Sequence, residues 1–292
     1  MVRRPGGYWS ASTSNTVRLS TRGWRAFPWR RSTASATRRL IAKRTLLTHP
    51  TRPTPIPIGE RRKPRPQGRP GFLRIDTVHQ GDQDGVKGIY HINAVDEVTQ
   101  WEVVSATPQI SERWLIPLLE QLLAQFPFTI RGFHSDNGSE FINYTVARLL
   151  EKLLIEQTKS RAHRTGDNGL VESKNGAIVR KHMGFSHIAA PHAEAVDQFH
   201  REHLNPYINF HRPCAVAEII EEPNGKRRRV YRQWATPLEI FTQIPECESF
   251  LRPGMNLAEL ESIALKQSDT EAAIAMQQAK KRLMNGIARR SA

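Results

Sequence analysis

The sequence predicts an α/β fold, a mixed five-stranded sheet flanked by helices, and three observations favour it. Three strand-like runs rich in β-branched and aromatic residues follow one another closely after residue 71. Two segments with helical spacing of apolar residues then alternate with two further short strand-like runs, and helical segments follow. Strands that first follow one another and then alternate with helices are typical of a mixed sheet with helices on its faces.

Each strand is predicted from an apolar run that is bounded by turn residues. The polar turn GDQDG separates the first two runs, and DEVTQ separates the second from the third. The fourth run, TIRGFH, ends directly before Ser135 and Asp136. We therefore expect strands at residues 72–78, 86–95, 101–106, 129–134 and 155–159.

The helices are predicted from apolar residues that repeat every three or four positions, as Leu115, Leu118, Leu119 and Leu122 do. We expect helices at residues 111–126, 144–154, 168–183 and 194–210, the third of them capped by Asn168. A Pro-Asn-Gly turn between residues 215–222 and 227–234 predicts a hairpin, and a helix-rich tail follows from about Pro237. The predicted parts are a basic, Pro-rich, mostly disordered arm and linker (1–70), a catalytic core (71–212) and a hairpin with a helical tail (213–292).

The net charge of +15 is concentrated at one end of the chain. The first 70 residues carry 17 of the 43 Lys and Arg residues and one acidic residue, whereas the rest is close to neutral. Residues 1–50 lack Asp, Glu and any helical or strand period, and residues 51–70 contain six prolines, so we expect a disordered arm and an extended linker. Such an arm attracts polyphosphate, although a solvated tail without a partner has the same composition.

Two cysteines, Cys214 and Cys247, form neither a CxxC pair nor a disulfide framework. The sequence also lacks a long apolar run and a secretory leader pattern. These features predict a protein of the reducing cytoplasm.

Three acidic residues stand out by position. Asp76 lies inside an apolar strand, Asp136 ends a strand before an Asn-Gly turn, and Glu172 lies one turn into a helix that follows the basic loop SRAHRTGDNG. Converging carboxylates repel one another unless a cation is present, and oxygen ligands select Mg²⁺ or Mn²⁺ over zinc. Position alone leaves two interpretations open: a metal site, or a core acid, a turn former and a solvated helix residue.

Three sequence blocks carry a resemblance to a known family. GFLRIDTVHQGD, GFHSDNGSEF and DNGLVESKNG resemble, in this order, the motif blocks of the integrase core of retroviral integrases and insertion-sequence transposases. Asp136 and Glu172 are separated by 35 residues, the spacing for which the D,D-35-E family is named. The resemblance covers about residues 71–212.

The resemblance implies an RNase H-like fold and a DNA transposase or integrase, a Mg²⁺-dependent polynucleotidyl transferase of DNA transposition, integration and recombination. Asp76, Asp136 and Glu172 would be its catalytic residues and would hold Mg²⁺ or Mn²⁺, with two ions expected. The implied partners are element ends and target DNA, with a homo-oligomer on DNA and neither a membrane nor a small-molecule cofactor. The resemblance further implies a prokaryotic, cytoplasmic protein that is associated with the nucleoid when it is bound to DNA.

DNA contacts are expected from residues other than those of retroviral cores, which carry lysines where this chain has Gly176 and Val179. The basic run GKRRRVYR, with Tyr231 and Trp234 nearby, is predicted to grip a DNA backbone or stack on an unpaired base; a solvated edge hairpin has the same pattern. The expected nucleic-acid-binding residues are Lys159, Arg161, Arg164, Asn168, Asn175, Arg180, Lys226, Arg227, Arg228 and Arg229.

The amino-terminal segment departs from the family pattern. No HHCC zinc module is possible with these cysteines, and residues 1–50 show no helix-turn-helix pattern. We interpret them as the product of a shifted reading frame or misassigned start, with a genuine domain as the alternative. A catalytically silent or truncated transposase remnant that only binds DNA is therefore a second hypothesis. A standalone RNase H-like nuclease is a third, disfavoured by the 35-residue spacing and the ESKNG context.

Overall fold

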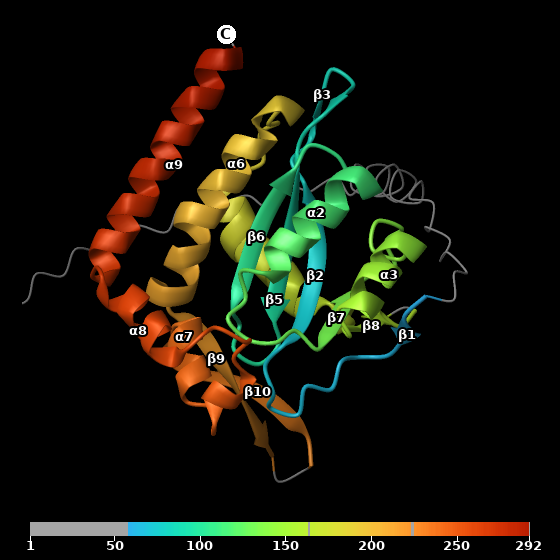
Figure 1. The fold of residues 1–292 in the computed structure, drawn as a ribbon, viewed down its shortest axis with the longest axis vertical. Helices are drawn as coiled ribbons and strands as arrows, with labels where there is room; N and C mark the ends of the chain where they lie inside the picture. The colour runs from blue at the N-terminus through green and yellow to red at the C-terminus, as the bar shows by residue number, and fades with distance from the viewer. Residues whose placement is uncertain (1–57, 163, 223–224, 292) are drawn as a thin grey trace, which may run out of the picture. The chain divides into compact units, whose positions relative to one another are not determined.

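The computed structural model describes residues 58–162, 164–222 and 225–291 (Figure 1). Most of the arm and linker predicted for residues 1–70 therefore lies outside the described residues. Within the described part of the linker, Glu60–Arg61 forms a short strand, β1. Residues 59–63 contain no proline, so they keep the N–H donors that a strand needs.

The central sheet is mixed, as the sequence predicts, and contains six strands in the order β1-β8-β7-β2-β5-β6. β1, β8, β7 and β2 run parallel, whereas β5 and β6 are antiparallel to their neighbours. The five longer strands correspond to the five predicted ones, and β1 is the addition. They are β2 (Phe72–His79), β5 (Tyr90–Asp96), β6 (Glu102–Thr107), β7 (Gly132–Ser135) and β8 (Glu156–Lys159).

The predicted second strand, residues 86–95, is interrupted. Its start forms a small hairpin, in which β3 (Asp82–Gln83) pairs with β4 (Val86–Lys87), and the sheet strand begins at Tyr90. Between them Gly88 N donates to Gly81 O at 2.7 Å and Ile89 N donates to Ile188 O at 2.9 Å. These bonds direct the backbone away from the sheet ladder.

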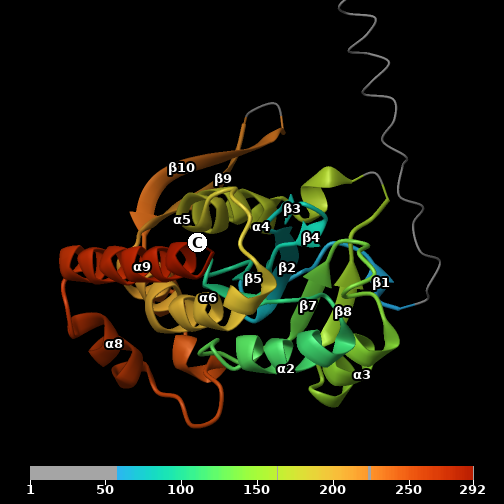
Figure 2. The same ribbon diagram turned by 90° about the horizontal axis from the view of Figure 1, so that it is seen from above.

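Helices cover both faces of the sheet, with α4 and α5 on one side and α2 and α3 on the other (Figure 2). The predicted helix at residues 168–183 is continuous but changes to π-helical geometry at Asn175–Arg180. The helix predicted at 194–210 likewise contains π-helical segments. The helices of the core are α2 (Glu112–Leu123), α3 (Tyr144–Lys152), α4 (Gly169–Lys174), α5 (Lys181–Met183), α6 (Ala193–Phe199), η4 (His200–Leu204) and η5 (Tyr207–His211).

Each face of the sheet has its own hydrophobic core. Leu73, Ile75 and Ile92 pack with buried leucines of α2 and α3. Val78, Val104 and Ala106, which point the other way because strand side chains alternate, pack with Ile178, Val179, α6 and α9. Asp76 belongs to this second face, two residues before Val78.

The carboxyl-terminal part contains the predicted hairpin and helical tail. β9 (Cys214–Glu221) pairs with β10 (Arg227–Ala235), and α7 (Pro237–Thr242), α8 (Leu257–Leu265) and α9 (Asp269–Ser291) follow. A capping box of Thr236 and Glu239 begins α7. Met276 and Ala279 of α9 are buried in the core that includes α6. Along residues 58–291, outside the gaps at 163 and 223–224, no helix is both long and apolar enough to cross a membrane.

Candidate catalytic carboxylate site

Strand register brings the first two acidic residues together. β2 and β7 are parallel neighbours, and Ile75 pairs with Ser135 at the last position of their ladder. Asp76 and Asp136 are the next residues on each strand, so both carboxylates lie at the same edge of the paired segment. Asp136 Oδ1 accepts a hydrogen bond from Gly138 N at 2.9 Å, which begins the turn that the Asn-Gly pair predicts.

Two asparagines attach the helix of Glu172 to the strand of Asp76. Asn168 Nδ2 donates to Ile75 O at 3.2 Å, and Asn175 Nδ2 donates to Asp76 Oδ2 at 2.7 Å. Positions 168, 172 and 175 lie on one face of a helix. Glu172 therefore lies between two points of attachment to β2 and faces the Asp76 region.

The electrostatics of Asp76 reflect this arrangement. The pKa of Asp76 is raised to about 6, chiefly by burial and also by the charges of Asp136 and Glu172, against hydrogen bonds from Thr77 N and Asn175 that lower it. Asp76 is partly buried, whereas Asp136 and Glu172 are exposed. The charges of Asp136 and Glu172 thus reach Asp76 and destabilise its ionised form.

The donor set fits a hard divalent cation by its chemistry. It consists of carboxylate oxygens, which Mg²⁺ and Mn²⁺ prefer, and a cation would offset the repulsion that raises the pKa of Asp76. Across the described ranges, however, no three His, Cys, Asp or Glu side chains are close enough to hold a metal ion. Since Asp136 and Glu172 are exposed, packing does not block the side-chain rotation that would bring them together.

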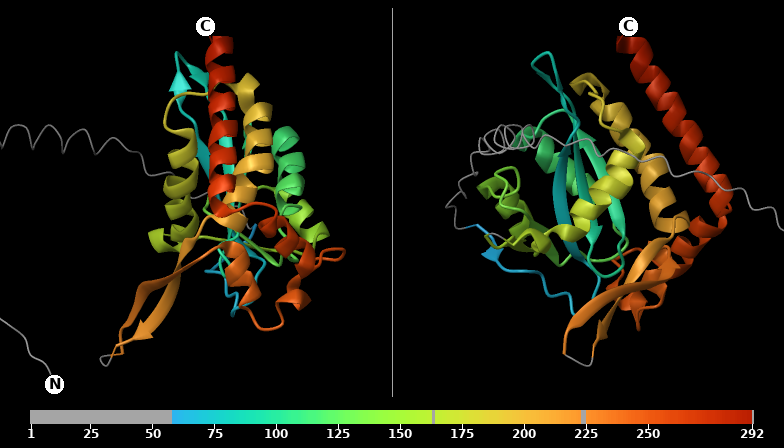
Figure 3. Two further views of the ribbon diagram at one scale, coloured as in Figure 1. Left: turned by 90° about the vertical axis from the view of Figure 1, so that its left-hand side faces the viewer. Right: turned by 180° about the vertical axis from the view of Figure 1, so that it is seen from behind.

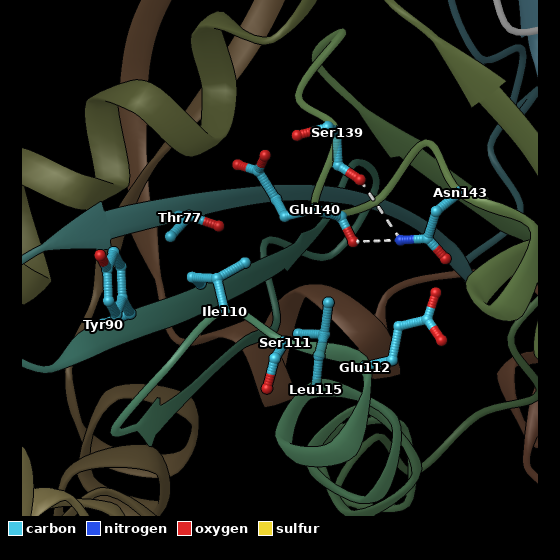
Figure 4. A pocket seen from close by; sticks show the side chains of 9 residues that line it. All are labelled: Thr77, Tyr90, Ile110, Ser111, Glu112, Leu115, Ser139, Glu140 and Asn143. Carbon is cyan, nitrogen blue, oxygen red and sulfur yellow. Dashed lines mark hydrogen bonds between the residues drawn. The ribbon is translucent and has the colours of Figure 1, made fainter.

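A hollow of about 470 Å³ lies on the α2 and α3 face of the sheet, and its lining includes neighbours of the two aspartates in the chain but none of the three carboxylates. Thr77, which follows Asp76, and Ser139 and Glu140, which follow Asp136, line it together with the start of α2 (Figure 4). Asn143 Nδ2 donates to Glu140 O at 2.8 Å and so holds the loop against the start of α3. Burial, followed by the charge of Asp136, raises the pKa of Glu140.

This hollow was not predicted from the sequence. Its walls come from segments that are far apart in the chain, and only their closeness to the two aspartates in the sequence could have indicated them. Glu140, which the sequence places in the same motif block as Asp136, lines the hollow beside the site.

Three predicted DNA-binding residues have internal partners instead. Asn168 and Asn175 hold the Glu172 helix to β2. Asn168 was also predicted as a helix cap, but its side chain makes no capping bond: its Nδ2 donates to Ile75 O, and its Oδ1, the atom that would accept a capping bond, has no partner among the described residues. Arg180 Nη2 donates to His79 O at 2.8 Å, and its guanidinium carbon lies over the Phe185 ring, 5.1 Å from the ring centroid.

The basic loop before the Glu172 helix is also partly engaged. Arg161 Nη2 lies 2.8 Å from Asp167 Oδ1, and this hydrogen-bonded partner holds the pKa of Asp167 well below its usual range. Lys159 is buried with 3% exposure, whereas Arg164 is exposed. Of the hairpin residues, Lys226, Arg228 and Arg229 are exposed, and the side chain of Arg227 lies outside the described atoms.

A buried ion pair lies behind the site and was not predicted. Lys174 Nζ is 3.7 Å from Glu102 Oε2, and both side chains are more than nine-tenths buried. Burial raises the pKa of Glu102 to about 7 against the opposing charge of Lys174. Asn93 Nδ2 donates to Asn175 Oδ1 at 2.9 Å, which links this interior to the amide that bonds Asp76.

His134, which the sequence suggests as a neighbour of the site, is buried. Its Nδ1 bonds with Thr158 Oγ1 at 2.9 Å and its Nε2 with Ser160 Oγ at 3.3 Å. Burial lowers the pKa of His134 to about 3. The ring is therefore neutral and holds β7 to β8.

Comparisons with known proteins give partial matches. No family model matches the chain. The uncharacterized protein y4rM of Sinorhizobium fredii (strain NBRC 101917 / NGR234) is 32% identical over 127 residues, which are 43% of this chain and 36% of that protein. The chain thus spans about a third of the length of this curated relative.

The similar solved structures are retroviral, and each match covers less than half of this chain. The simian T-cell lymphotropic virus intasome in complex with PP2A regulatory subunit B56 gamma has 18% identity and a TM-score of 0.36, over 46% of each chain. The BIV integrase catalytic core has 18% sequence identity and a TM-score of 0.32, and the match covers 39% of this chain and 68% of that one. The HTLV-2 integrase catalytic core in complex with magnesium has 19% sequence identity and a TM-score of 0.32, and the match covers 39% of this chain and 70% of that one.

Proposed function

We propose that the chain is a metal-dependent DNA strand-transfer enzyme of the integrase and transposase type. The observation that carries the proposal is that the β2–β7 register places Asp76 and Asp136 at adjacent positions, while two asparagine bonds attach the helix of Glu172 to β2. These residues occupy the acidic positions of three motif blocks that resemble an integrase core. Their mutual repulsion supports a role that includes a cation.

In this proposal the three carboxylates hold two divalent ions, which supply activation of the attacking hydroxyl and stabilisation of the leaving oxygen. Asn175 orients Asp76 through its 2.7 Å bond, so one ligand oxygen is directed before substrate arrives. Asn168 and Asn175 together set the position of Glu172. The loop that follows Asp136 would receive the DNA strand that is attacked or joined.

The decisive experiment uses pre-cut ends of the DNA that flanks the gene, incubated with protein and Mg²⁺ or Mn²⁺. Joining of these ends to a plasmid is expected for the wild type and lost in Asp136→Asn, because the substitution removes a charged ligand and keeps its size. Asp84→Asn is the matched control, since Asp84 is exposed and lies outside the site. Strand transfer that persists at the wild-type level in Asp136→Asn contradicts the proposal.

Metal binding supplies a second readout that does not depend on activity. Mn²⁺ titrated into the full chain and followed by electron paramagnetic resonance should bind to the wild type and to Asp84→Asn. The affinity should fall in Asp76→Asn and Asp136→Asn. Equal affinities in all four proteins would exclude these carboxylates as the metal ligands.

A second candidate is a DNA-binding remnant that no longer catalyses. It is favoured by one observation: none of the described carboxylate groups is assembled closely enough to hold a metal ion. The same assays separate the candidates, because a remnant binds DNA in the absence of both Mn²⁺ binding and strand transfer. Cleavage of RNA–DNA hybrids alone would favour a nuclease instead.

A further inference from the structure

The β9–β10 hairpin has one face packed on the body and one face open. Cys214 and Ala235 are buried and pack with Ile240 of α7. On the opposite face Tyr231 is 57% exposed and Trp234 is 70% exposed. Large exposed aromatic side chains on a hairpin are unusual unless they contact a partner.

A β-bulge places the two aromatic residues on the same face. Residues three apart in a regular strand point to opposite faces, so Tyr231 and Trp234 would ordinarily be separated. The register shifts between Tyr231 and Gln233. Tyr231 therefore pairs with Ala217 before the shift, and Trp234 pairs with Ala215 after it. Ala215 and Ala217 are two apart and share a face, and the two rings therefore do too. A bulge of this kind re-aims a side chain.

The residues around the two rings leave them accessible. Their cross-strand partners are alanines, which are too short to cover a ring. Arg229 pairs with Ile219 on this same face and is exposed, and Arg232 at the bulge is exposed as well. Arg228 lies on the other face, where its Nε is 3.8 Å from Glu222 Oε1. The open face thus combines two stacking surfaces with exposed arginine side chains, and Glu221 lies at its far end opposite Arg227.

The hairpin lies on the side of the sheet that carries the Glu172 helix. β9, β10, α4 and α5 share this side in two perpendicular views (Figures 2 and 3). Arg229 is close enough to Arg74 to contribute to the lowering of its pKa, and Arg74 Nη1 donates to Asp167 O, next to the start of α4. A strand that leaves the carboxylates on this side can therefore reach the hairpin.

We propose that this open face of the hairpin binds unpaired DNA, with Tyr231 and Trp234 stacked on bases and Arg229 beside the phosphates. The bases of a duplex are covered by their neighbours, so two free rings suit a single strand or a frayed end. The inference rests on the proposed function only for the origin of the DNA, because binding requires neither metal nor chemistry.

The test measures binding of the full chain, in EDTA, to three labelled DNAs: a short oligothymidine, a blunt duplex and a duplex with a single-stranded end. Trp234→Leu and Tyr231→Leu should each weaken binding to the first and third by about 5- to 150-fold and leave the blunt duplex unchanged. Trp234→Phe and Tyr231→Phe should retain most of the affinity, since phenylalanine keeps a stacking face. Trp114→Leu, an exposed tryptophan on α2, is the control.

A charge pair tests the same face independently. Arg229→Ala should reduce the salt dependence of oligothymidine binding by about one counterion, whereas Arg228→Ala, on the opposite face beside Glu222, should change it less. If the two leucine variants lose affinity equally for blunt and single-stranded DNA, or lose none, the proposal is overturned. A change of molar mass by light scattering in the leucine variants with DNA binding intact also overturns it, because it would assign the face to a second copy.

The two proposals can fail separately. Strand transfer that is absent in the wild type, with selective binding to unpaired DNA retained, removes the proposed function and leaves the hairpin assignment in place. Strand transfer that occurs normally in Trp234→Leu, with unchanged binding to all three DNAs, removes the hairpin assignment alone.

Discussion

The two faces of the central sheet are built on different principles. Beneath α2 and α3 the sheet presents Leu73, Ile75 and Phe133, each with no exposed surface, to an apolar core. Beneath α4 the neighbouring strands β5 and β6 bury Asn93 and Glu102 together with aliphatic residues. Apolar contacts tolerate small shifts, whereas each buried polar group needs a partner at a defined position. The first face therefore supplies stability, and the second fixes where the carboxylates lie.

The largest expected effect is on the apolar face. Phe126→Ala should lower the free energy of unfolding by about 3–5 kcal/mol, because the buried ring leaves a cavity beside Phe128. Urea unfolding followed by circular dichroism measures the loss, which should not depend on pH or metal. Phe185→Ala, at an exposed position, should change stability by less than about 0.5 kcal/mol. A small loss in Phe126→Ala would break the contrast between the faces.

The second effect tests the polar face through Lys174→Met. The substitution leaves Glu102 buried without its cation and should cost about 3 kcal/mol at about pH 8.5. The pKa of Glu102, already raised to about 7 by burial, should rise further, so at about pH 5.5 Glu102 is protonated in both proteins and the loss should shrink. Urea unfolding at the two pH values measures the difference.

The direction of this pH dependence of stability follows from the titration of Glu102 in the folded state. A carboxyl whose pKa is raised by folding stabilises the fold below its unfolded pKa, and this contribution is lost as the pH rises through the folded value. Glu102→Gln combined with Lys174→Met should therefore recover stability at high pH, since no buried charge is left. A loss that is independent of pH, or not relieved in the double variant, would show that Lys174 acts by packing alone.

The smallest effect is a gain of stability from Asp76→Asn without metal. Burial raises the pKa of Asp76 to about 6, so the ionised carboxylate opposes folding above that pH. The variant should be more stable by about 1–2 kcal/mol at about pH 7.5 and indistinguishable from wild type near pH 4. Thermal unfolding in EDTA measures the gain, and Asp84→Asn serves as the control. A loss of stability at about pH 7.5 would mean that Asp76 is stabilised as an anion without a cation.

Much of the fold could be predicted from sequence because it depends on local patterns. The leucine spacing predicts α2, and the apolar runs predict the five longer strands, since side chains of helices and strands repeat with different periods. β1 could not be predicted, because its two residues, Glu60 and Arg61, have no strand pattern and pair only where β8 offers an edge. The break at Gly88 likewise depends on bonds to distant segments.

The carboxylates could be named from the motif blocks, but the residues that support them could not. Asn168 and Asn175 were expected to contact DNA, since an exposed amide on a helix and one that bonds to a strand look alike in sequence. Lys174 and Glu102 are 72 positions apart, and their pairing follows from the packing of α4 on the sheet.

The sequence by itself determined which residues we propose for the chemistry, the order of the elements and the concentration of charge in the first 70 residues. Tertiary structure decided how those residues meet: the register of β2 with β7 brings Asp76 and Asp136 together, and the asparagine bonds orient Glu172. It also decided that Tyr231 and Trp234 share a face, because a single bulge reverses the alternation that the sequence implies. Register and bulges depend on contacts between distant segments, and these contacts exist only once the chain has folded.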